Sequence, residues 1–247
     1  MAIQINDRDQ LIFKLIDEHK VLLEKHISYF ISDDNIKPVL IRDRLRKLFY
    51  LDYLSCKRYD FKLSWWTTPT KPIMYMLTGM SKEVIGNVEI DIEDIDDKLQ
   101  KHYLELANLR MLYHIAQSNN KISDFKWQTL KNNCKFTGGF DAIVSFTLNN
   151  QSVKKAIINC NKASEISLEN IKKDVSLNSI DEILIVFQSQ EDLDVFQKFI
   201  NTDLVLSKIC NLTTHQLVYK EETSPIGSLQ NIEFNAKSSM TSKFAVA

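Results

Sequence analysis

The feature that most limits how this chain can fold is an acidic segment at residues 83–97, which holds seven acids and neither Lys nor Arg. A composition shift of this kind favours a solvated linker between two domains. The 247 residues are long enough for two modest domains. We therefore predict a first domain at 1–80, a linker at 81–97, a second domain at 98–220 and a flexible tail at 221–247. In an alternative interpretation, the acidic segment mimics DNA and folds onto a basic domain.

The first eighty residues show the pattern of a winged helix-turn-helix domain. Apolar residues recur at helical spacing in three stretches, 6–19, 21–31 and 39–54. Two strand-like segments follow at 54–59 and 73–77. Three short helices followed by a two-stranded hairpin is the element order of a winged helix, a variant of the helix-turn-helix.

Basic side chains are concentrated in this region. The whole chain has a formal net charge of −1, but residues 37–62 contain eight basic and three acidic side chains, a local charge of +5. The basic residues are Lys37, Arg42, Arg44, Arg46, Lys47, Lys57, Arg58 and Lys62. Because the net charge provides no bulk attraction to nucleic acid, a DNA-binding surface has to be local.

Two of these arginines are placed to read DNA from the third helix. Arg42 and Arg46 lie four residues apart, away from an apolar face that includes Phe49. A helix that packs by one face and presents guanidinium groups on the other suits the major groove, and the basic hairpin would contact flanking phosphates. In the alternative interpretation the helix face is merely solvated, with Asp43 paired to Lys47.

Trp65 and Trp66 are adjacent in the loop of the hairpin. Two neighbouring side chains of an extended segment cannot both point inward. We therefore expect one ring to pack and the other to contact a partner, and we include Trp65 in the predicted DNA surface. The ordinary alternative leaves both rings partly buried under the hairpin.

The second half of the chain is predicted to be a mixed α/β domain, which makes the whole chain α/β (α+β). A helix is expected at 97–118, with a broad apolar face. Strands are expected at 124–129, 140–148, 153–160, 182–188 and 215–219, and further helices at 165–177 and 190–201. A turn at Asn149-Asn150 joins two of these strands into a hairpin.

The cysteines and the apolar runs indicate a cytoplasmic protein. The four cysteines are widely spread, without a CxxC motif or zinc spacing, which favours reduced structural thiols. The polar start MAIQINDRDQ is not a signal peptide. No apolar run approaches 18 residues, so no membrane partner is expected.

The order of these features resembles the replication-relaxation family of plasmid and mobile-element proteins over roughly residues 6–200. The resemblance is carried by INDRDQLIFKLIDEHKVLLEKHISYFI with RDRLRKLFYLDYL, by KPIMYMLT, and by KHYLELANLRMLYHI followed by GFDAIVSF and AIINCNKA. It implies an N-terminal winged helix followed by a restriction-endonuclease-like domain. Some members of the family act in relaxosomes at a transfer origin.

The same resemblance implies a candidate catalytic site that is degenerate. Asp141 matches the first acid of a Mg²⁺-dependent nuclease, but Asn159 and Asn161 stand where further charged residues are usual. Lys162 is one place late for the lysine, and His102 matches a histidine of the family's helix. Because Mg²⁺ prefers carboxylate oxygen, a neutral amide weakens the site. Glu105 or Glu165 would have to supply the missing carboxylate.

We therefore predict a DNA-binding accessory protein of plasmid or mobile-element transfer or replication, with a nuclease-like domain that is inactive. Its expected partners are double-stranded DNA and, by resemblance, a relaxase or other relaxosome proteins, and the second domain would supply dimerisation or further DNA contacts. No cofactor is expected unless the domain is active, in which case it is Mg²⁺. The alternatives are a metal-dependent DNA nickase at a transfer origin and a winged-helix transcriptional regulator.

Overall fold

The computed structural model of the chain describes residues 4–31, 38–60, 63, 65, 66, 69–86, 95–130 and 139–219. It is a mixed α/β structure with two sheets and two compact units, Met1–Met111 and Leu112–Ala247. The division between the units falls inside helix α5 (Asp97–Ser118) rather than in the acidic segment. Residues 87–94 of that segment, and the whole of the tail predicted at 221–247, lie outside the described residues.

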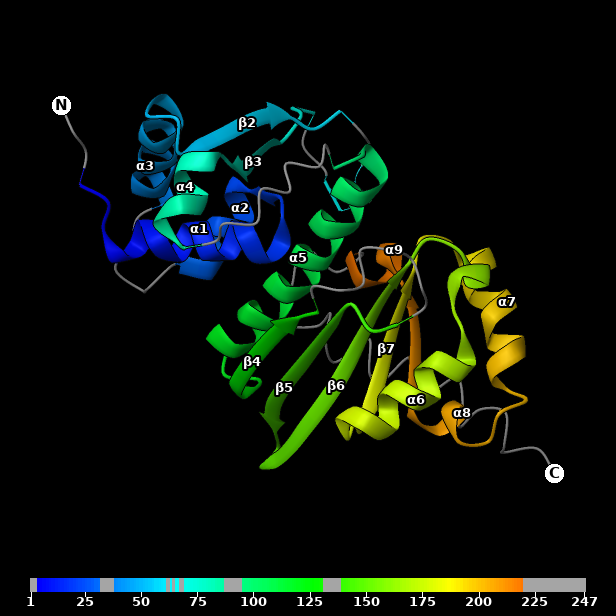
Figure 1. Cartoon of the computed structure of the whole chain (residues 1–247). Helices are drawn as coiled ribbons and strands as arrows, with labels where there is room; N and C mark the ends of the chain where they lie inside the picture. The colour runs from blue at the N-terminus through cyan, green and yellow to red at the C-terminus, as the bar shows by residue number, and fades with distance from the viewer. Residues whose placement is uncertain are drawn as a thin grey trace. The chain divides into compact units, whose positions relative to one another are not determined.

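The first unit combines small helices with a small antiparallel sheet (Figure 1). Its elements are α1 (Asp7–His19), β1 (Leu22–Leu23), α2 (Glu24–Ile31), α3 (Pro38–Tyr50), β2 (Leu54–Arg58), β3 (Ile73–Leu77) and α4 (Gly79–Val84). The strand order is β1-β3-β2, with both pairings antiparallel. The three predicted helices and the hairpin are therefore present, whereas β1 and α4 were not predicted.

The amphipathic helices of this unit meet in one hydrophobic core. Its centre includes Ile12 and Ile16 from α1, Ile27 from α2 and Leu45 from α3. A reciprocal cap fixes the start of α1, because the Asn6 side chain accepts from the backbone of residue 9 and the residue 9 carboxylate accepts from the backbone of Asn6. The cap and the core together determine which face of each helix remains for solvent.

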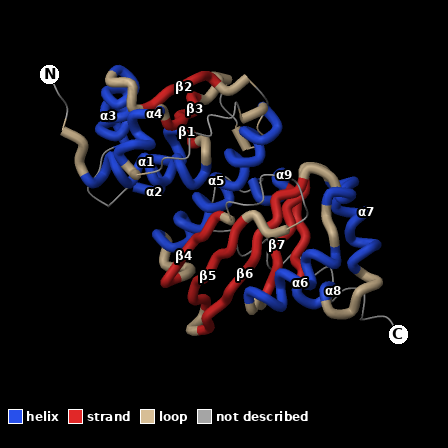
Figure 2. The backbone as a smooth tube through the Cα atoms, in the orientation of Figure 1, coloured by secondary structure: helices blue, strands red, loops and turns tan. Residues whose placement is uncertain are grey.

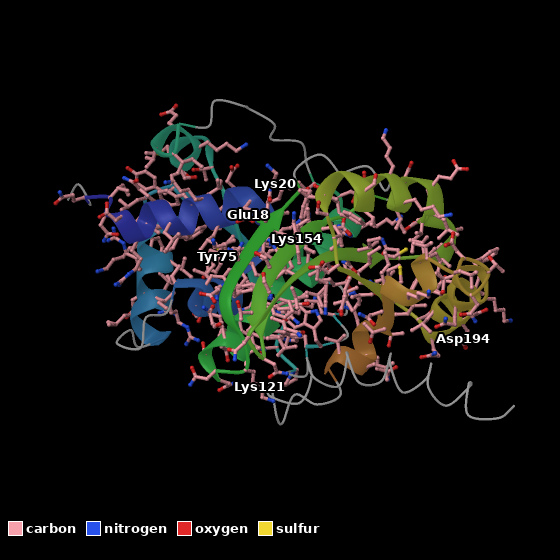
Figure 3. The ribbon with its side chains drawn as sticks, turned by 90° about the horizontal axis from the view of Figure 1, so that it is seen from below. Glu18, Lys20, Tyr75, Lys121, Lys154 and Asp194 are labelled. Atoms are coloured by element: carbon pink, nitrogen blue, oxygen red, sulfur yellow. The ribbon has the colours of Figure 1, made fainter. Side chains whose placement is uncertain are left out.

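The N-terminal part of α5 also belongs to the first unit. Ala107 contributes to its hydrophobic core. Glu18, which Figure 3 labels on α1, accepts through Oε2 from Nη1 of Arg110 over 2.8 Å. The second domain was predicted to begin with this helix. In the structure, roughly the first four turns of α5 belong to the first unit instead.

The second unit is built on a five-stranded sheet in the order β4-β5-β6-β7-β8 (Figure 2). Its elements after α5 are β4 (Ser123–Thr129), β5 (Ala142–Leu148), β6 (Gln151–Cys160), a 3₁₀ turn (Ala163–Glu165), α6 (Leu168–Asn178), β7 (Glu182–Phe187), α7 (Gln190–Ile200), α8 (Leu206–Ile209), β8 (Cys210–Thr214) and α9 (His215–Tyr219). The strands β4, β5 and β6 form an antiparallel meander, and β6, β7 and β8 are parallel.

Local chemistry explains why the sheet forms in this order. Asn149 and Asn150 both have positive φ angles, 49° and 63°, as a two-residue hairpin turn requires. The parallel strands need crossover connections, which α6 and α7 provide. Both helices pack on one core cluster with the sheet, through Ile171 of α6 and Phe196 of α7. Lys154 of β6 donates from Nζ to a backbone carbonyl at the end of α6 over 2.6 Å (Figure 3).

Three details of the prediction are wrong. The strand predicted at 215–219 is the helix α9, because the hydroxyl of Thr214 accepts from the backbone N–H of Leu217 over 3.2 Å and so caps a helical turn. The helix predicted at 165–177 begins instead at Leu168, where the hydroxyl of Ser167 caps it by accepting the backbone N–H of Asn170. Phe49, expected to pack with the apolar face of α3, is exposed. Among the described helices, none combines the length and hydrophobicity needed to cross a bilayer.

Candidate functional site

A groove in the first unit brings together α2, α3 and the β2–β3 hairpin. Its volume is about 950 Å³, and its described lining residues all fall between Leu23 and Tyr75. This size is at the upper end of what ligand sites usually enclose. The groove follows from the fold, because α3 packs through its Ile41 and Leu45 side and leaves Arg42 and Arg46 in the groove lining.

The walls of this groove are strongly basic. Among the described lining residues, five side chains are basic and one, that of Glu24, is acidic. The basic residues are Lys25, Arg42, Arg46, Arg58 and Lys71. Clustering of one sign of charge in a concave surface strengthens the local potential and attracts the opposite charge. The groove therefore attracts anions although the chain as a whole is nearly neutral.

Arg42 and Arg46 of α3 both line this groove. Their side chains are 55% and 64% exposed, for Arg42 and Arg46 respectively. The Arg42 Nε atom donates to Oε1 of Glu24 over 2.8 Å, and this hydrogen bond raises the pKa of Arg42. Arg46 lies 3.8 Å from the carboxylate of Asp43. Both ion pairs are exposed, so a polyanion can compete for the guanidinium groups at small cost.

Aromatic side chains also line the groove. The rings that line it are Tyr29, Phe49, Tyr50, Trp66 and Tyr75. Tyr50 is 80% exposed. Trp66 is held in place, because its Nε1 donates to the backbone carbonyl of Thr70 over 2.7 Å and its ring packs edge-on against Trp65. Burial raises the pKa of Tyr75 to about 12, so its hydroxyl is not a ready nucleophile at neutral pH.

The structure divides the predicted DNA-binding residues into separate groups. Arg42, Arg46 and Arg58 line the groove. Lys47 and Lys57 are exposed but lie outside its lining. Lys37 and Lys62 fall outside the described residues.

Two of the predicted DNA-binding residues point into the protein instead. Arg44 donates from Nε to Oδ1 of the buried Asp9 over 2.8 Å, so its guanidinium group is committed to the fold. Trp65 is only 2% exposed and packs beside His26. Its neighbour Trp66 is the tryptophan that faces the groove. Arg44 and Trp65 therefore do not belong to the groove surface.

Several residues that line the groove were not predicted from the sequence. Lys25 and Tyr29 lie four apart on α2, and Lys71 precedes β3. All three lie outside the basic stretch 37–62, so its local charge did not reveal them. The four-residue spacing of Lys25 and Tyr29, which places both on one helix face, is the signal that would have found them.

In the second unit, Asp141 and Asn159 lie side by side. Asp141 precedes β5, and its Oδ2 accepts the backbone N–H of Asn159 on β6 over 2.6 Å. The Asn159 Oδ1 atom lies 2.7 Å from Nε2 of His215 at the start of α9. Since an amide oxygen only accepts, His215 carries a proton on Nε2. All three side chains are buried.

This cluster has one carboxylate, that of Asp141. The position where a nuclease would have its second acid is held by the amide of Asn159, which is hydrogen-bonded. The amide oxygen of Asn159 is engaged by the imidazole of His215. His215 was missed because residue 215 was predicted to begin a strand. The hydrogen-bonded link joins β5, β6 and α9, which is the role of a structural polar network.

The remaining predicted catalytic residues are divided between the two units. Lys162 is exposed and Asn161 is half-buried, both just beyond β6. His102 lies in the first unit, where its ring packs edge-on against Tyr103, and the buried Glu105 also lies in the first unit, 3.6 Å from the ammonium group of Lys101.

Cys160, the next residue after Asn159 on β6, is not a ready nucleophile. Burial raises the pKa of the Cys160 thiol to about 12, so this thiol stays protonated at neutral pH. Over the parts of the chain that the structure describes, no group of three or more His, Cys, Asp or Glu side chains is arranged to hold a metal ion.

Comparison of the chain with protein-family models, with curated proteins and with solved structures found no match.

Proposed function

We propose that this chain is a DNA-binding accessory protein of plasmid or mobile-element transfer or replication. The first unit binds double-stranded DNA through α3 and the β2–β3 hairpin, and the second unit is a nuclease-derived scaffold that does not cut. The observation that carries this proposal is the groove beside α3, with five basic side chains against one acid among its described lining. The proposed plasmid context, and a relaxase or another relaxosome protein as partner, come from the resemblance to the replication-relaxation family.

The element order of the first unit supports a winged-helix assignment. Helix α3 follows α2 directly, the hairpin follows α3, and the short β1 pairs with β3. In this arrangement α3 is the recognition helix, with its packed face toward the core and Arg42 and Arg46 toward the DNA. Lys57 and Arg58 on the hairpin are then available for phosphates beside the site.

The chemistry of the second unit supports a scaffold rather than a nuclease. A metal-dependent nuclease needs carboxylates to concentrate negative charge at one point. Asn159 contributes none, and its amide is used to position His215. One oxygen of Asp141 is used to accept a backbone N–H.

A nicking assay on supercoiled plasmid with Mg²⁺ or Mn²⁺ separates the scaffold from a nickase. We expect no nicked circles from the wild type and none from Asp141→Ala. Nicking by the wild type that disappears in Asp141→Ala would show that the second unit is an active enzyme.

Selection from a random duplex pool tests DNA reading and identifies the preferred sequence in the same experiment. On the enriched sequences, Arg42→Ala and Arg46→Ala should each cost about 1–3 kcal/mol of binding free energy if they reach bases. Lys173→Ala, which removes an exposed charge from the second unit, should leave the affinity unchanged. Enriched sequences that map to promoters rather than to transfer or replication origins would favour a transcriptional regulator.

A further inference from the structure

The aromatic rings of the groove are not explained by binding to a double helix. Tyr29, Phe49 and Tyr50 are all exposed, and they line the same groove as Trp66, whose ring is oriented by its hydrogen bond to Thr70. In a duplex, each base is covered by its neighbours, so phosphates and groove edges are what it presents to a protein. Exposed aromatic surface at a basic groove is costly in water and calls for a partner with flat apolar faces.

Unpaired nucleotides have the two properties that this groove complements. Their phosphates match the basic side chains Arg42, Arg46 and Arg58, and their free base faces match the aromatic rings. Tyr50 offers an almost fully exposed ring next to Phe49, whose centroid is 5.6 Å from that of Tyr50. Trp66 loses little freedom on binding, because the hydrogen bond to Thr70 already orients its ring.

We propose that the groove between α2, α3 and the β2–β3 hairpin holds unpaired nucleotides of a DNA strand, stacked on Tyr50 and Trp66. This inference rests on the DNA-binding function proposed above and names the form of DNA that the groove takes. The protein then prefers DNA with a melted or single-stranded stretch over a fully paired duplex. An acidic protein segment would satisfy the basic side chains but would leave the rings without a stacking partner.

The test measures, by fluorescence anisotropy, how tightly the full chain binds three labelled DNAs. These are oligothymidine, the same strand paired to its complement, and a duplex with a central unpaired stretch. An oligonucleotide of the same length with abasic sites carries the same charge without bases. We expect oligothymidine and the interrupted duplex to bind about ten-fold more tightly than the abasic strand. Equal affinity for the abasic strand and for oligothymidine, or displacement of oligothymidine by polyglutamate of equal charge, would overturn the proposal.

Paired substitutions at Tyr50 separate stacking from loss of fold. Tyr50→Leu keeps apolar bulk and removes the ring, and we expect it to weaken oligothymidine binding about ten-fold while duplex binding stays within about two-fold. Tyr50→Phe keeps the ring and should behave as wild type. Leu40→Ala is the matched control, since Leu40 is an exposed apolar residue of the same helix that does not line the groove. Equal losses in the Leu and Phe variants would contradict stacking.

Tryptophan fluorescence gives an independent readout. The three tryptophans are the buried Trp65, the groove residue Trp66, and Trp127 in the second unit. We expect oligothymidine to quench the emission, and we expect Trp66→Phe to abolish the quenching while keeping most of the affinity. Quenching that persists in Trp66→Phe would place the bases elsewhere. A chain that binds the intact duplex but shows neither a Tyr50 effect nor quenching would refute this inference alone, whereas failure to bind any DNA would refute the proposed function.

Discussion

The guanidinium group of Arg44 on α3 holds the carboxylate of Asp9 on α1. Its Nε atom donates to Oδ1 over 2.8 Å, an Nη2 N–H reaches Oδ2, and Nη2 also donates to the backbone carbonyl of Gln4 over 3.1 Å. Asp9 is completely buried. Of the three arginines of α3, Arg44 therefore fixes the helix to the unit, and Arg42 and Arg46 remain at the groove.

Arg44 and Arg46 should give opposite phenotypes. Arg44→Ala leaves a buried carboxylate without its cation, and we expect it to lower the free energy of unfolding by about 3 kcal/mol. Arg46→Ala removes an exposed group and should change stability by less than about 0.5 kcal/mol, while weakening DNA binding. Urea unfolding and DNA titration of both variants check this. Equal stability of the two variants would contradict the assignment of Arg44 to the fold.

Glu24 should act as a brake on DNA binding. Its carboxylate accepts from Arg42 and is the acid of the described groove lining. Glu24→Gln removes one negative charge and frees the guanidinium group, so we expect affinity for duplex DNA to rise about two- to five-fold, the range that an exposed ion pair allows. Titration at low salt measures the effect best. Weaker binding by Glu24→Gln would show that Glu24 orients Arg42 for DNA rather than competing with it.

The stability of the protein should fall in mild acid because of His26. Burial, with a smaller contribution from the charge of His19, lowers the pKa of His26 to about 3. The unfolded chain takes up a proton below about pH 6.5 and the folded chain does not, so stability is complete above that pH. It is then lost as the pH falls from about 6.5 toward 3, by up to about 1.4 kcal/mol per pH unit.

Urea unfolding at pH 7.5, 6.5 and 5.5 measures this loss. In His26→Gln we expect a shallower dependence on pH, since a group that does not titrate replaces the imidazole. The glutamine oxygen can still accept the backbone N–H that Leu23 donates to Nδ1 of His26 over 3.4 Å. The same pH dependence in the variant and the wild type would assign the acid sensitivity to other groups.

The buried ion pair of the second unit predicts an asymmetry between its two partners. Lys155 on β6 is 2% exposed and lies opposite Glu182 on β7, with 3.1 Å between Nζ and Oε2. Glu182→Ala leaves the ammonium group buried and should cost about 3 kcal/mol of unfolding free energy. Lys155→Met fills the same space with an apolar chain, and the partly exposed Glu182 still accepts from Asn211, so we expect a loss of about 1 kcal/mol.

Thermal and urea unfolding of Glu182→Ala and Lys155→Met check this asymmetry. Both variants remove the same ion pair, but Glu182→Ala leaves the buried ammonium group behind, whereas Lys155→Met leaves the partly exposed carboxylate. Equal losses of unfolding free energy in the two variants would mean that the attraction within the ion pair, rather than the desolvation of the Lys155 ammonium group, determines the size of the loss.

Elements with strong local patterns were predictable from the sequence. The β5–β6 hairpin was found because Asn149-Asn150 separates two apolar strands, and α1 because its apolar spacing is regular. In contrast, β1 has two residues and exists only through pairing with β3, where Leu22 lies opposite Tyr75. A pattern needs several repeats to be visible, and a two-residue strand has none.

The candidate site was only partly predictable, because side-chain directions depend on distant partners. The spacing of α3 could not show that Arg44 would pair with Asp9, 35 residues away in the sequence. Nor could it show that Phe49 is exposed, since its face is determined by how α3 packs. The link from Asn159 to His215 spans 56 residues and depends on the sheet order. Long-range contacts of this kind are not encoded in any local window.

The salt dependence of duplex binding tests the central claim most directly. For mixed-sequence duplex, each protein–phosphate ion pair contributes about −0.9 to the slope of log K against log salt. We expect Arg46→Ala/Arg58→Ala, which removes one groove charge from α3 and one from β2, to reduce the magnitude of the slope by about 1.8. The control Lys173→Ala/Lys198→Ala removes two exposed charges from the second unit and should keep the wild-type slope. Identical slopes for all three proteins, or a wild type that binds no duplex, would contradict the account.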